Sequence, residues 1–432
     1  MKRDDMNHLQ QEDLGVLRFL TCGSVDDGKS TLIGRLLYDT KTLLTDTIAT
    51  LEKNAHKRGL SALDLSLLTD GLMAEREQGI TIDVAYRYFA TARRKFIIAD
   101  APGHEQYTRN MVTAASTADV AILLVDARKG LLPQTKRHAT LAGLLGIQHW
   151  VLAINKMDLV DYQQTTFDTI VHDFEQWLGQ HPEMKVQVQC IPMSALEGEM
   201  VVSRGNHLAW YAGPTLLEVL EAAPSSQLNA DAALRFPVQW VCRPAQSEVH
   251  HDFRAYAGRI ESGSVSVGDE LLVLPAGKTS RVSRIGLGET ELASAFAGQS
   301  VMICLADDID ISRGDMLVKV GASTPTESKE QTATVCWLSS ETLSPARSYL
   351  VKHTTREVKA RISSVEARLD IHTLSYTTEN NAAPVQLNDI VRLKFKTQQA
   401  LFADAYAQSR ATGSFILIDE ASHNTVAAGL LD

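Results

Sequence analysis

The sequence lacks the features that mark membrane and secreted proteins. Among its 432 residues no apolar run approaches the roughly 18 that a membrane-spanning helix needs, and residues 1–13 are polar where a signal peptide has an apolar core. The five cysteines stand apart, with no C-x-x-C pair and no metal-ligand spacing, which is typical of reduced thiols in the cytosol. We therefore expect a cytoplasmic protein that has no contact with a membrane.

Positive charge is also scarce. The chain has 42 Lys and Arg against 52 Asp and Glu, a formal net charge of −10, and this acidity disfavours broad nonspecific binding to nucleic acid. We expect no nucleic-acid partner, although the argument is weak against a single local basic site. Hydrophobic residues make up 44% of the chain, which is enough to bury real cores, and the length suggests about two to four domains.

The first half of the chain alternates strands and helices. Short, apolar and mostly β-branched segments predict strands, and Pro133 suits the first turn of a helix. Buried strands separated by helices favour a mainly parallel sheet covered on both faces, while the turn at Arg93 and Arg94 predicts one antiparallel hairpin at the sheet edge. The expected strands are residues 16–22, 82–89, 96–99, 120–125, 151–154 and 186–191, and the expected helices are 30–37 and 133–145.

After residue 224 the pattern changes to short strands separated by turn clusters. Linker-like stretches at residues 224–232 and 321–330 divide this half, which predicts two successive all-β barrels of about a hundred residues each. Strands of the first barrel are expected at residues 238–242, 258–261, 270–275, 281–285 and 301–305. The predicted domains are residues 1–223, 232–322 and 330–432.

Residues 23–31 form a phosphate-binding loop with the pattern G-x-x-x-x-G-K-[ST], placed between an expected strand and an expected helix. The glycines let the backbone curl so that its N–H groups reach phosphate oxygens, and the lysine would neutralise the β- and γ-phosphates. The serine hydroxyl would be a Mg²⁺ ligand. The residues assigned to the nucleotide here are Gly23, Ser24, Val25, Asp26, Asp27, Gly28, Lys29, Ser30 and Thr31.

A phosphate loop alone serves ATPases, kinases or GTPases, so the downstream motifs decide. Asp100-Ala101-Pro102-Gly103-His104 follows an expected strand; the aspartate can hold a water on Mg²⁺, and the glycine N–H can reach the γ-phosphate. Upstream, the hydroxyl of Thr81 offers a further Mg²⁺ ligand while γ-phosphate is present. The predicted metal ligands are therefore Ser30, Thr81 and Asp100.

Asn155-Lys156-Met157-Asp158 is the base-reading motif. The Asp158 carboxylate can accept two hydrogen bonds from guanine, whereas adenine presents no such pair of donors and would leave the carboxylate unpaired. Ser194 and Ala195 follow the last expected strand and would back the base with main-chain N–H. The order of these motifs, each at a strand end, predicts GTP with Mg²⁺.

These motifs resemble those of the translational GTPase superfamily. The resemblance lies in Gly-Ile-Thr at residues 79–81, the motifs beginning at Asp100 and Asn155, and two turn patterns of the first barrel at residues 258–263 and 267–269. Within that superfamily the chain is most similar to the family of GTPase subunits of bacterial sulfate adenylyltransferase, over nearly its whole length. The most specific stretches are residues 22–40, 70–89 and 96–111.

Two loop residues favour this family over the elongation factors. Elongation factors usually carry a histidine at the position of Ser24, and commonly histidine or serine at the position of Asp27, which argues against tRNA delivery. Ala101 departs from the threonine expected in the family, a mild change that should not disturb Asp100 or Gly103.

The resemblance implies a fold and a task. The fold is an α/β P-loop GTPase domain with a mainly parallel sheet, followed by two β-barrels. A partner small subunit would bind ATP and sulfate and transfer the adenylyl group, and GTP hydrolysis by this chain would drive that uphill reaction. In hydrolysis Lys29, Gly103 and His104 are the expected catalytic residues; His104 would orient the attacking water, with Val25 and Ile80 restricting its entry. The alternative is an elongation-factor-like GTPase that delivers an RNA.

Overall fold

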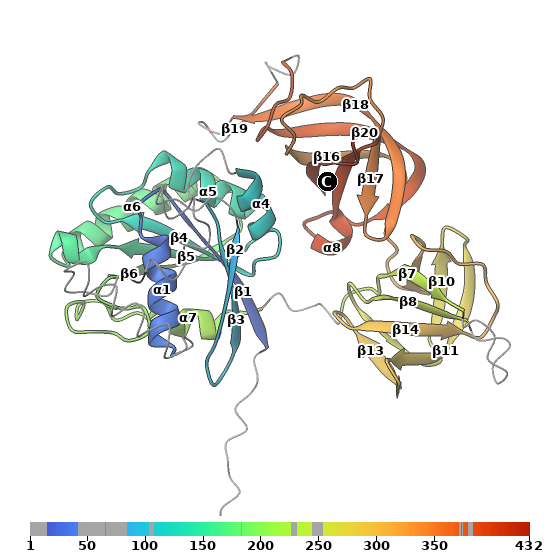
Figure 1. Cartoon of the computed structure of the whole chain (residues 1–432), viewed down its shortest axis with the longest axis horizontal. Helices are drawn as coiled ribbons and strands as arrows, with labels where there is room; N and C mark the ends of the chain where they lie inside the picture. The colour runs from blue at the N-terminus through green and yellow to red at the C-terminus, as the bar shows by residue number, and fades with distance from the viewer. Residues whose placement is uncertain are drawn as a thin grey trace, which may run out of the picture. The chain divides into compact units, whose positions relative to one another are not determined.

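The computed structural model describes residues 15–41, 65, 84–102, 108–182, 184–225, 231–243, 254–370, 373, 375–378 and 383–432. The chain divides into two compact units, Met1–Ser226 and Gln227–Asp432, whose elements are drawn in Figure 1. Within the described ranges, no helix combines the length and the apolar character that crossing a bilayer requires.

The first unit is built on a six-stranded sheet with the order β2-β3-β1-β4-β5-β6. β1 pairs in parallel with both β3 and β4, and β5 and β6 continue the parallel pairing. β2 runs antiparallel to β3, which confirms the predicted edge hairpin. The strands are β1 (Val16–Gly23), β2 (Ala85–Ala90), β3 (Lys95–Asp100), β4 (Val120–Asp126), β5 (His149–Asn155) and β6 (Gln187–Pro192).

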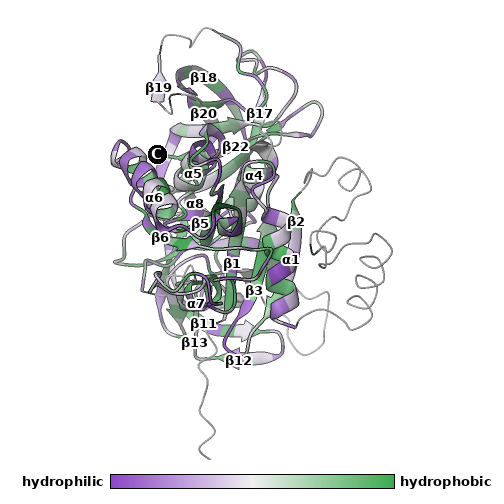
Figure 2. Cartoon of the chain, turned by 90° about the vertical axis from the view of Figure 1, so that its left-hand side faces the viewer, coloured by the Kyte–Doolittle hydropathy of each residue, from purple (hydrophilic) through white to green (hydrophobic). Residues whose placement is uncertain are grey.

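Helices connect these strands, as a parallel sheet requires. α5 begins with a proline at its first turn, and α7 begins at Thr215 with a capping box, in which the Thr215 hydroxyl accepts from Glu218 N and the Glu218 carboxylate accepts from Thr215 N. Figure 2 shows the mixture of polar and apolar residues along α1 and α6 and the apolar strands beside them. The helices are α1 (Lys29–Asp39), α4 (Thr108–Ala115), α5 (Pro133–Leu144), the 3-10 turn η3 (Met157–Val160), α6 (Gln164–Gly179) and α7 (Leu216–Ala222).

The β2–β3 hairpin is fastened to the end of α7. The buried Arg94 guanidinium donates to the carbonyls of Leu220, Glu221 and Ala223, and Thr91 Oγ1 donates to the Glu221 carboxylate at 2.7 Å. These bonds satisfy carbonyl groups that a helix leaves without an internal partner at its carboxyl end.

The second unit contains two closed barrels. In the first, the ring β10-β15-β7-β8-β14-β11 closes because β11 also pairs with β10; in the second, the ring β17-β21-β22-β16-β20-β18 closes because β18 also pairs with β17. The first barrel contains β7 (Phe236–Cys242), β8 (Ala255–Arg259), β9 (Ser264–Ser266), β10 (Glu270–Leu274), β11 (Lys278–Leu287), β12 (Thr290–Leu292), β13 (Ser294–Phe296), β14 (Ser300–Leu305) and β15 (Met316–Lys319). The second contains β16 (Thr326–Trp337), β17 (Tyr349–His353), β18 (Arg356–Asp370), β19 (Ser375–Thr377), β20 (Ile390–Ala403), the short α8 (Arg410–Gly413), β21 (Ser414–Asp419) and β22 (Thr425–Leu431).

The predicted fold class, a parallel α/β domain followed by two barrels, is confirmed, with two local differences. The stretch 321–330, expected as a linker, contains the start of β16, where Glu327 pairs with Phe402. Its polar residues lie on the outer face of a barrel, where a strand needs no apolar side chains. The strand expected at 258–261 ends at Arg259. The boundaries of the three domains remain predictions.

Candidate functional site

The phosphate loop lies where β1 ends and α1 begins, as the sequence predicts. Gly28 caps the helix with φ 96°, a left-handed conformation that favours glycine, and a Cβ there would collide with Asn155 Nδ2. Asp26 also has a positive φ of 67°. A Cβ on Gly23 would lie 2.8 Å from the carbonyl oxygen of Leu124. No other residue would therefore fit at either glycine of the motif without a shift of the loop.

Lys29 reaches back over this loop. Its side chain is buried, and Nζ donates to the carbonyl oxygens of Gly23 at 3.1 Å and Ser24 at 2.8 Å. Burial lowers the pKa of Lys29, while the nearby Asp100 and Asp27 act in the opposite direction. The ammonium group is thus held over the curled backbone, while Ser30 and Thr31 follow Lys29 in the first turn of α1.

Asn155, at the end of β5, joins the two halves of the candidate site. Its Nδ2 donates to the carbonyl of Asp27 in the phosphate loop at 2.8 Å, and its Oδ1 accepts from Ala195 N at 2.9 Å. The side chain is buried, so both hydrogen bonds are shielded from water. The structure therefore brings together the phosphate loop, Asn155 and Ala195, which the sequence analysis assigned to one nucleotide.

Lys156 stands in a charged cluster that the sequence analysis missed. Its Nζ donates to the Asp26 carbonyl and lies 3.0 Å from Asp126 Oδ2, and Asp126 also binds Arg128 Nη2 at 2.6 Å. Burial alone would raise the pKa of Asp126, but the hydrogen bonds from Arg128 and Lys156 hold it well below its usual range. A signal existed: Asp126 ends β4, as Asp100 ends β3 and Asn155 ends β5, and parallel strands place such ends at one edge.

Asp158 has the unsatisfied group expected of a base-reading residue. It lies in η3, and its Oδ1 is buried without a hydrogen-bond partner among the residues that the structure describes. Met157 beside it is part of the core, and Ser194 and Ala195 are buried after β6. A buried carboxylate oxygen left without a donor is costly unless a ligand supplies one.

Arg35 on α1 contacts the loop after β6, which is predicted to lie behind the base, and this contact was also missed. Its Nε donates to the carbonyl of Ala195 at 3.1 Å, and its Nη2 donates to the carbonyl of Leu196. A single arginine in a helix carries no motif, so the sequence held no signal for this contact. The helix that starts at the phosphate loop is thereby tied to the loop that contains Ala195 and Leu196.

The third predicted motif is described in part. Asp100 Oδ1 accepts from Thr21 Oγ1 at 3.2 Å, and Ala101 N donates to the Thr21 carbonyl at 3.3 Å. Asp100, Ala101 and Pro102 are buried at the end of β3, close to Lys29. Thr81, Gly103 and His104, together with Ile80, lie outside the described residues. Val25 is half-buried in the phosphate loop.

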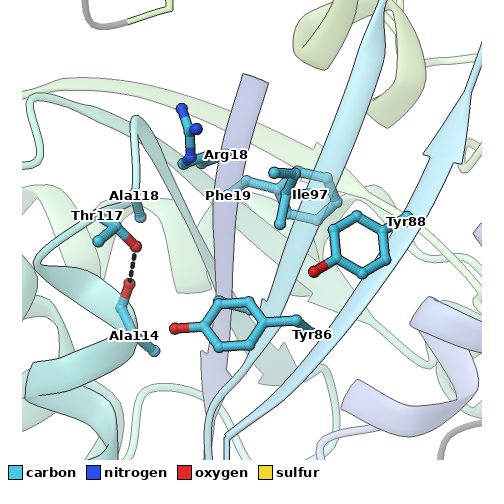
Figure 3. A pocket seen from close by; sticks show the side chains of 9 residues that line it. Arg18, Phe19, Tyr86, Tyr88, Ile97, Ala114, Thr117 and Ala118 are labelled. Carbon is cyan, nitrogen blue, oxygen red and sulfur yellow. Dashed lines mark hydrogen bonds between the residues drawn. The ribbon is translucent and has the colours of Figure 1, made fainter. Parts of the chain in front are cut away.

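A separate hollow of about 260 Å³ lies between β2 and α4, with Tyr86 and Tyr88 at its rim. Figure 3 shows the two rings beside Ile97 and Phe19, with Arg18 and Thr117 on the opposite side. None of the residues that line it belongs to the nucleotide motifs.

Comparison with known proteins decides the family. Residues 15–225 match the elongation factor Tu GTP binding domain, and residues 330–432 match the GTP-eEF1A C-terminal domain-like family. The chain is 48% identical over 426 residues to sulfate adenylyltransferase subunit 1 of Erwinia tasmaniensis, covering 98% of this chain and 87% of that protein. The chain belongs to the sulfate adenylyltransferase subunit 1 family.

Further relatives agree with this family. The chain is 52% identical over 418 residues to the bifunctional enzyme CysN/CysC of Mycobacterium tuberculosis, covering 96% of this chain and 67% of that protein. Among solved structures, the Ski7 GTPase-like domain of S. cerevisiae, bound to GDP and inorganic phosphate, matches with a TM-score of 0.51 and 16% identity over 98% of each chain. That likeness concerns the fold alone.

Proposed function

We propose that this chain is the GTPase subunit of a sulfate adenylyltransferase. GTP binds at the phosphate loop and is hydrolysed, and hydrolysis drives a partner small subunit to make adenosine 5′-phosphosulfate. In that transfer a sulfate oxygen forms a bond to the α-phosphorus of ATP, and the bond to the departing diphosphate breaks. The proposal is supported by the near-full-length identity to proteins named sulfate adenylyltransferase subunit 1 and by the match to a GTP binding domain.

The observation that carries the nucleotide assignment is the Asn155 bridge together with Asp158. Through this bridge the Asn155 side chain bonds both to the phosphate loop, at Asp27, and to the loop after β6, at Ala195. The unpartnered Asp158 Oδ1 is the acceptor that the guanine N1–H and N2–H donors would satisfy. Adenine would leave it unsatisfied, so the site favours GTP over ATP. Lys156 and Met157 would flank the base, with Ser194 and Ala195 behind it.

The donor set fits Mg²⁺ better than a softer metal. The described residues hold no cluster of three or more His, Cys, Asp or Glu that could bind a metal by itself. Mg²⁺ is usually held by one or two protein oxygens together with phosphate and water. Ser30 and Asp100 are such oxygens, and Thr81 would add a third. When bound, Mg²⁺ would supply positive charge that neutralises the phosphate oxygens.

The chain's own residues would position the hydrolytic reaction. Lys29 would neutralise charge on the β- and γ-phosphates, and Gly103 N–H would donate to the γ-phosphate. His104 would orient the attacking water, with Val25 and Ile80 as apolar neighbours. These roles rest on the resemblance of the motifs. In-line attack on phosphate requires positioned groups and needs no covalent intermediate with the protein.

Coupling requires that the partner bind two nucleotide states differently, because a ligand shifts an equilibrium only through differential affinity. The segments at residues 75–81 and 100–104, which sense the γ-phosphate, are the elements proposed to report that state. The small subunit would hold ATP and sulfate, and the pair is proposed to work in the cytoplasm without nucleic acid.

The decisive experiment measures GTP hydrolysis by this chain alone and with the candidate small subunit, ATP and sulfate. We expect hydrolysis to accelerate in the full mixture and adenosine 5′-phosphosulfate to accumulate with GTP consumed. Omission of sulfate is the matched control and should remove the acceleration. No acceleration, together with binding of aminoacyl-tRNA, would overturn the proposal in favour of an RNA carrier.

A further inference from the structure

One of the two acidic residues in the phosphate loop is buried. Asp27 is 1% exposed, and its Oδ2 accepts from Ser24 N at 2.6 Å. Its Oδ1 is buried and finds no hydrogen-bond partner within the described part of the chain. The neighbouring Asp26, by contrast, is exposed. Two acidic residues of one loop thus have opposite surroundings.

The buried carboxylate opposes phosphate binding in two ways. Phosphate is attracted by backbone N–H groups of the loop and by Lys29, and Asp27 engages the N–H of Ser24 itself. Its negative charge also repels the phosphates across protein, where water and salt screen it much less than at the surface. The charge of Asp26, which faces solvent, is screened.

Charged and polar neighbours of Asp27 act on its pKa in both directions. Burial is the largest influence and raises the pKa of Asp27, while the Ser24 amide and the nearby Lys29 and Lys129 lower it and Asp126 raises it further. Among the residues that the structure describes, neither lysine donates a hydrogen bond to the carboxylate; Lys29 Nζ donates to two carbonyl groups instead. An asparagine would accept the same Ser24 N–H without the charge, so loop shape alone does not require an acid.

The loop is also prevented from swinging the carboxylate away. The Asp27 carbonyl accepts from Asn155 Nδ2 at 2.8 Å, and the Ser24 hydroxyl donates to Gln134 Oε1 on α5 at 3.3 Å. The Asn155 side chain therefore holds the backbone at Asp27, and the Gln134 side chain holds the hydroxyl of Ser24. The repulsion acts on a fixed loop.

We propose that Asp27 sets the rate of nucleotide release: its buried negative charge weakens the binding of GDP and GTP and so shortens the time that GDP stays after hydrolysis. The inference rests on the proposed function, because it requires guanine nucleotide at this loop. According to this inference, the Asp27 side chain determines whether GDP is retained after hydrolysis or exchanged readily.

The test replaces the charge and keeps the acceptor. In Asp27→Asn, dissociation of a fluorescent GDP analogue, displaced by excess GDP in a stopped-flow instrument, should slow about tenfold, and the Kd for GDP and GTP should fall by a similar factor. Asp27→Ser, which also keeps an oxygen acceptor without the charge, is the second variant and should change both quantities in the same direction. Both proteins are first compared with the original chain by circular dichroism.

Two further variants distinguish the effect of the buried charge from the effect of a change in the net charge of the protein. Asp26→Asn removes an exposed charge from the same loop and should slow release less than about threefold. Asp168→Asn removes an exposed charge from α6, away from the loop, and should leave release unchanged. Equal effects of Asp26→Asn and Asp27→Asn, or release from Asp27→Asn and Asp27→Ser that is unchanged or faster, would overturn the inference. If the original chain bound no guanine nucleotide at all, the proposed function itself would fall, which is a distinguishable result.

Discussion

Two aspartates, the buried Asp27 and the half-buried Asp404, show how differently the two units of this chain use charge. Asp404 in the barrel unit has both oxygens engaged: Oδ1 accepts from Arg235 Nη2 at 2.8 Å, and Oδ2 accepts from Arg235 Nε at 2.9 Å and from Thr412 Oγ1 at 2.6 Å. Burial alone would raise the pKa of Asp404, but the bonds from Arg235 and Thr412 lower it. Asp27 in the GTPase unit has one engaged oxygen, and its pKa is raised.

We interpret the charge of Asp404 as structural and that of Asp27 as functional. Arg235 precedes β7 of one barrel and Asp404 follows β20 of the other, so their ion pair joins the two barrels, as does the shared apolar cluster of Met316, Val318 and Phe402. In this pair both oxygens of Asp404 have hydrogen-bond donors within the protein, so the charge needs no ligand. In the GTPase unit, the buried Asp158 Oδ1 has no hydrogen-bond partner among the described residues, and the proposed partner is a ligand.

The largest expected effect comes from breaking the structural pair. Arg235→Ala leaves the half-buried Asp404 without its cation, and we expect the barrel unit to lose about 3 kcal/mol of stability. Hydrogen exchange measured by mass spectrometry should show the loss in β7 and β20, with the Kd for GTP unchanged. The matched control is Arg259→Ala, which breaks an exposed pair with Glu261 and should lose less than about 1 kcal/mol. If both substitutions had an equally small effect on stability, the assignment of a structural role to the Arg235–Asp404 pair would be wrong.

Two glycines with nearly the same backbone angle sharpen the contrast between the units. Gly28 has φ 96° and would collide with Asn155 if it carried a Cβ; Gly268 has φ 91° and open space around it. Gly28→Ala should weaken GTP binding by about a hundredfold, measured by calorimetry, because the loop must move. Gly268→Ala carries the same backbone strain, so it should lower the stability of the barrel unit by about 1 kcal/mol and leave GTP affinity intact. Similar GTP affinities in the two variants would contradict the required loop shape.

The unsatisfied oxygen of Asp158 predicts a change in base preference. Asp158→Asn presents an amide in place of an acceptor, so GTP affinity should fall about tenfold to a hundredfold while affinity for xanthosine triphosphate rises. Competition of both nucleotides for a fluorescent GDP analogue measures the ratio. Asp161→Asn, an exposed aspartate three residues later, serves as the control and should keep the preference for GTP. Unchanged GTP use by Asp158→Asn would refute the assignment of this residue to the base.

The smallest expected effect is a pH dependence of opposite sign for the two aspartates. Asp404 has a folded pKa below the ordinary 3.8, so its stabilisation is complete above that value and is lost as the pH falls through the folded pKa. Asp27 has a folded pKa above 3.8, so its charge destabilises the fold at neutral pH and the penalty is relieved as the pH falls through that raised pKa.

Hydrogen exchange of Asp27→Asn and Asp404→Asn between pH 8 and 4 tests these signs. The stability gained by Asp27→Asn should shrink towards acid pH, by at most about 1.4 kcal/mol per pH unit, while the loss in Asp404→Asn stays constant over this range. The original chain at each pH is the reference. A gain in Asp27→Asn that grew towards acid pH would contradict the burial of a charged Asp27.

The sequence was sufficient for the parts of the site that depend on backbone patterns. Strands predicted from apolar runs end at Asp100 and Asn155, and the helix after the phosphate loop begins at Lys29. Spacing was informative because parallel strands direct their carboxyl ends to one edge. The two barrels followed in the same way from short strands and turn clusters, although β16 begins inside the expected linker.

What sequence could not supply was the set of long-range side-chain contacts. Arg35 reaches Ala195 and Leu196 across about 160 positions of the chain, and Arg128 with Asp126 holds Lys156. Each is a single polar residue on an ordinary element, and such residues are usually solvated. Only the folded chain shows which of them face inward. The burial of Asp27 beside an exposed Asp26 is of this kind too, because adjacent acids in one loop look alike in sequence.

The two hydrogen bonds of Asn155 have a consequence for ligand size. One amide group holds the Asp27 carbonyl and the Ala195 N–H relative to each other, so the spacing between the two loops proposed to bind the phosphates and the base depends on a single planar group. A planar amide neither stretches nor bends appreciably. In the proposed nucleotide site this spacing would act as a fixed gauge of length, which a nucleoside with its phosphates would span and which a free base or free diphosphate, each filling one end, would not.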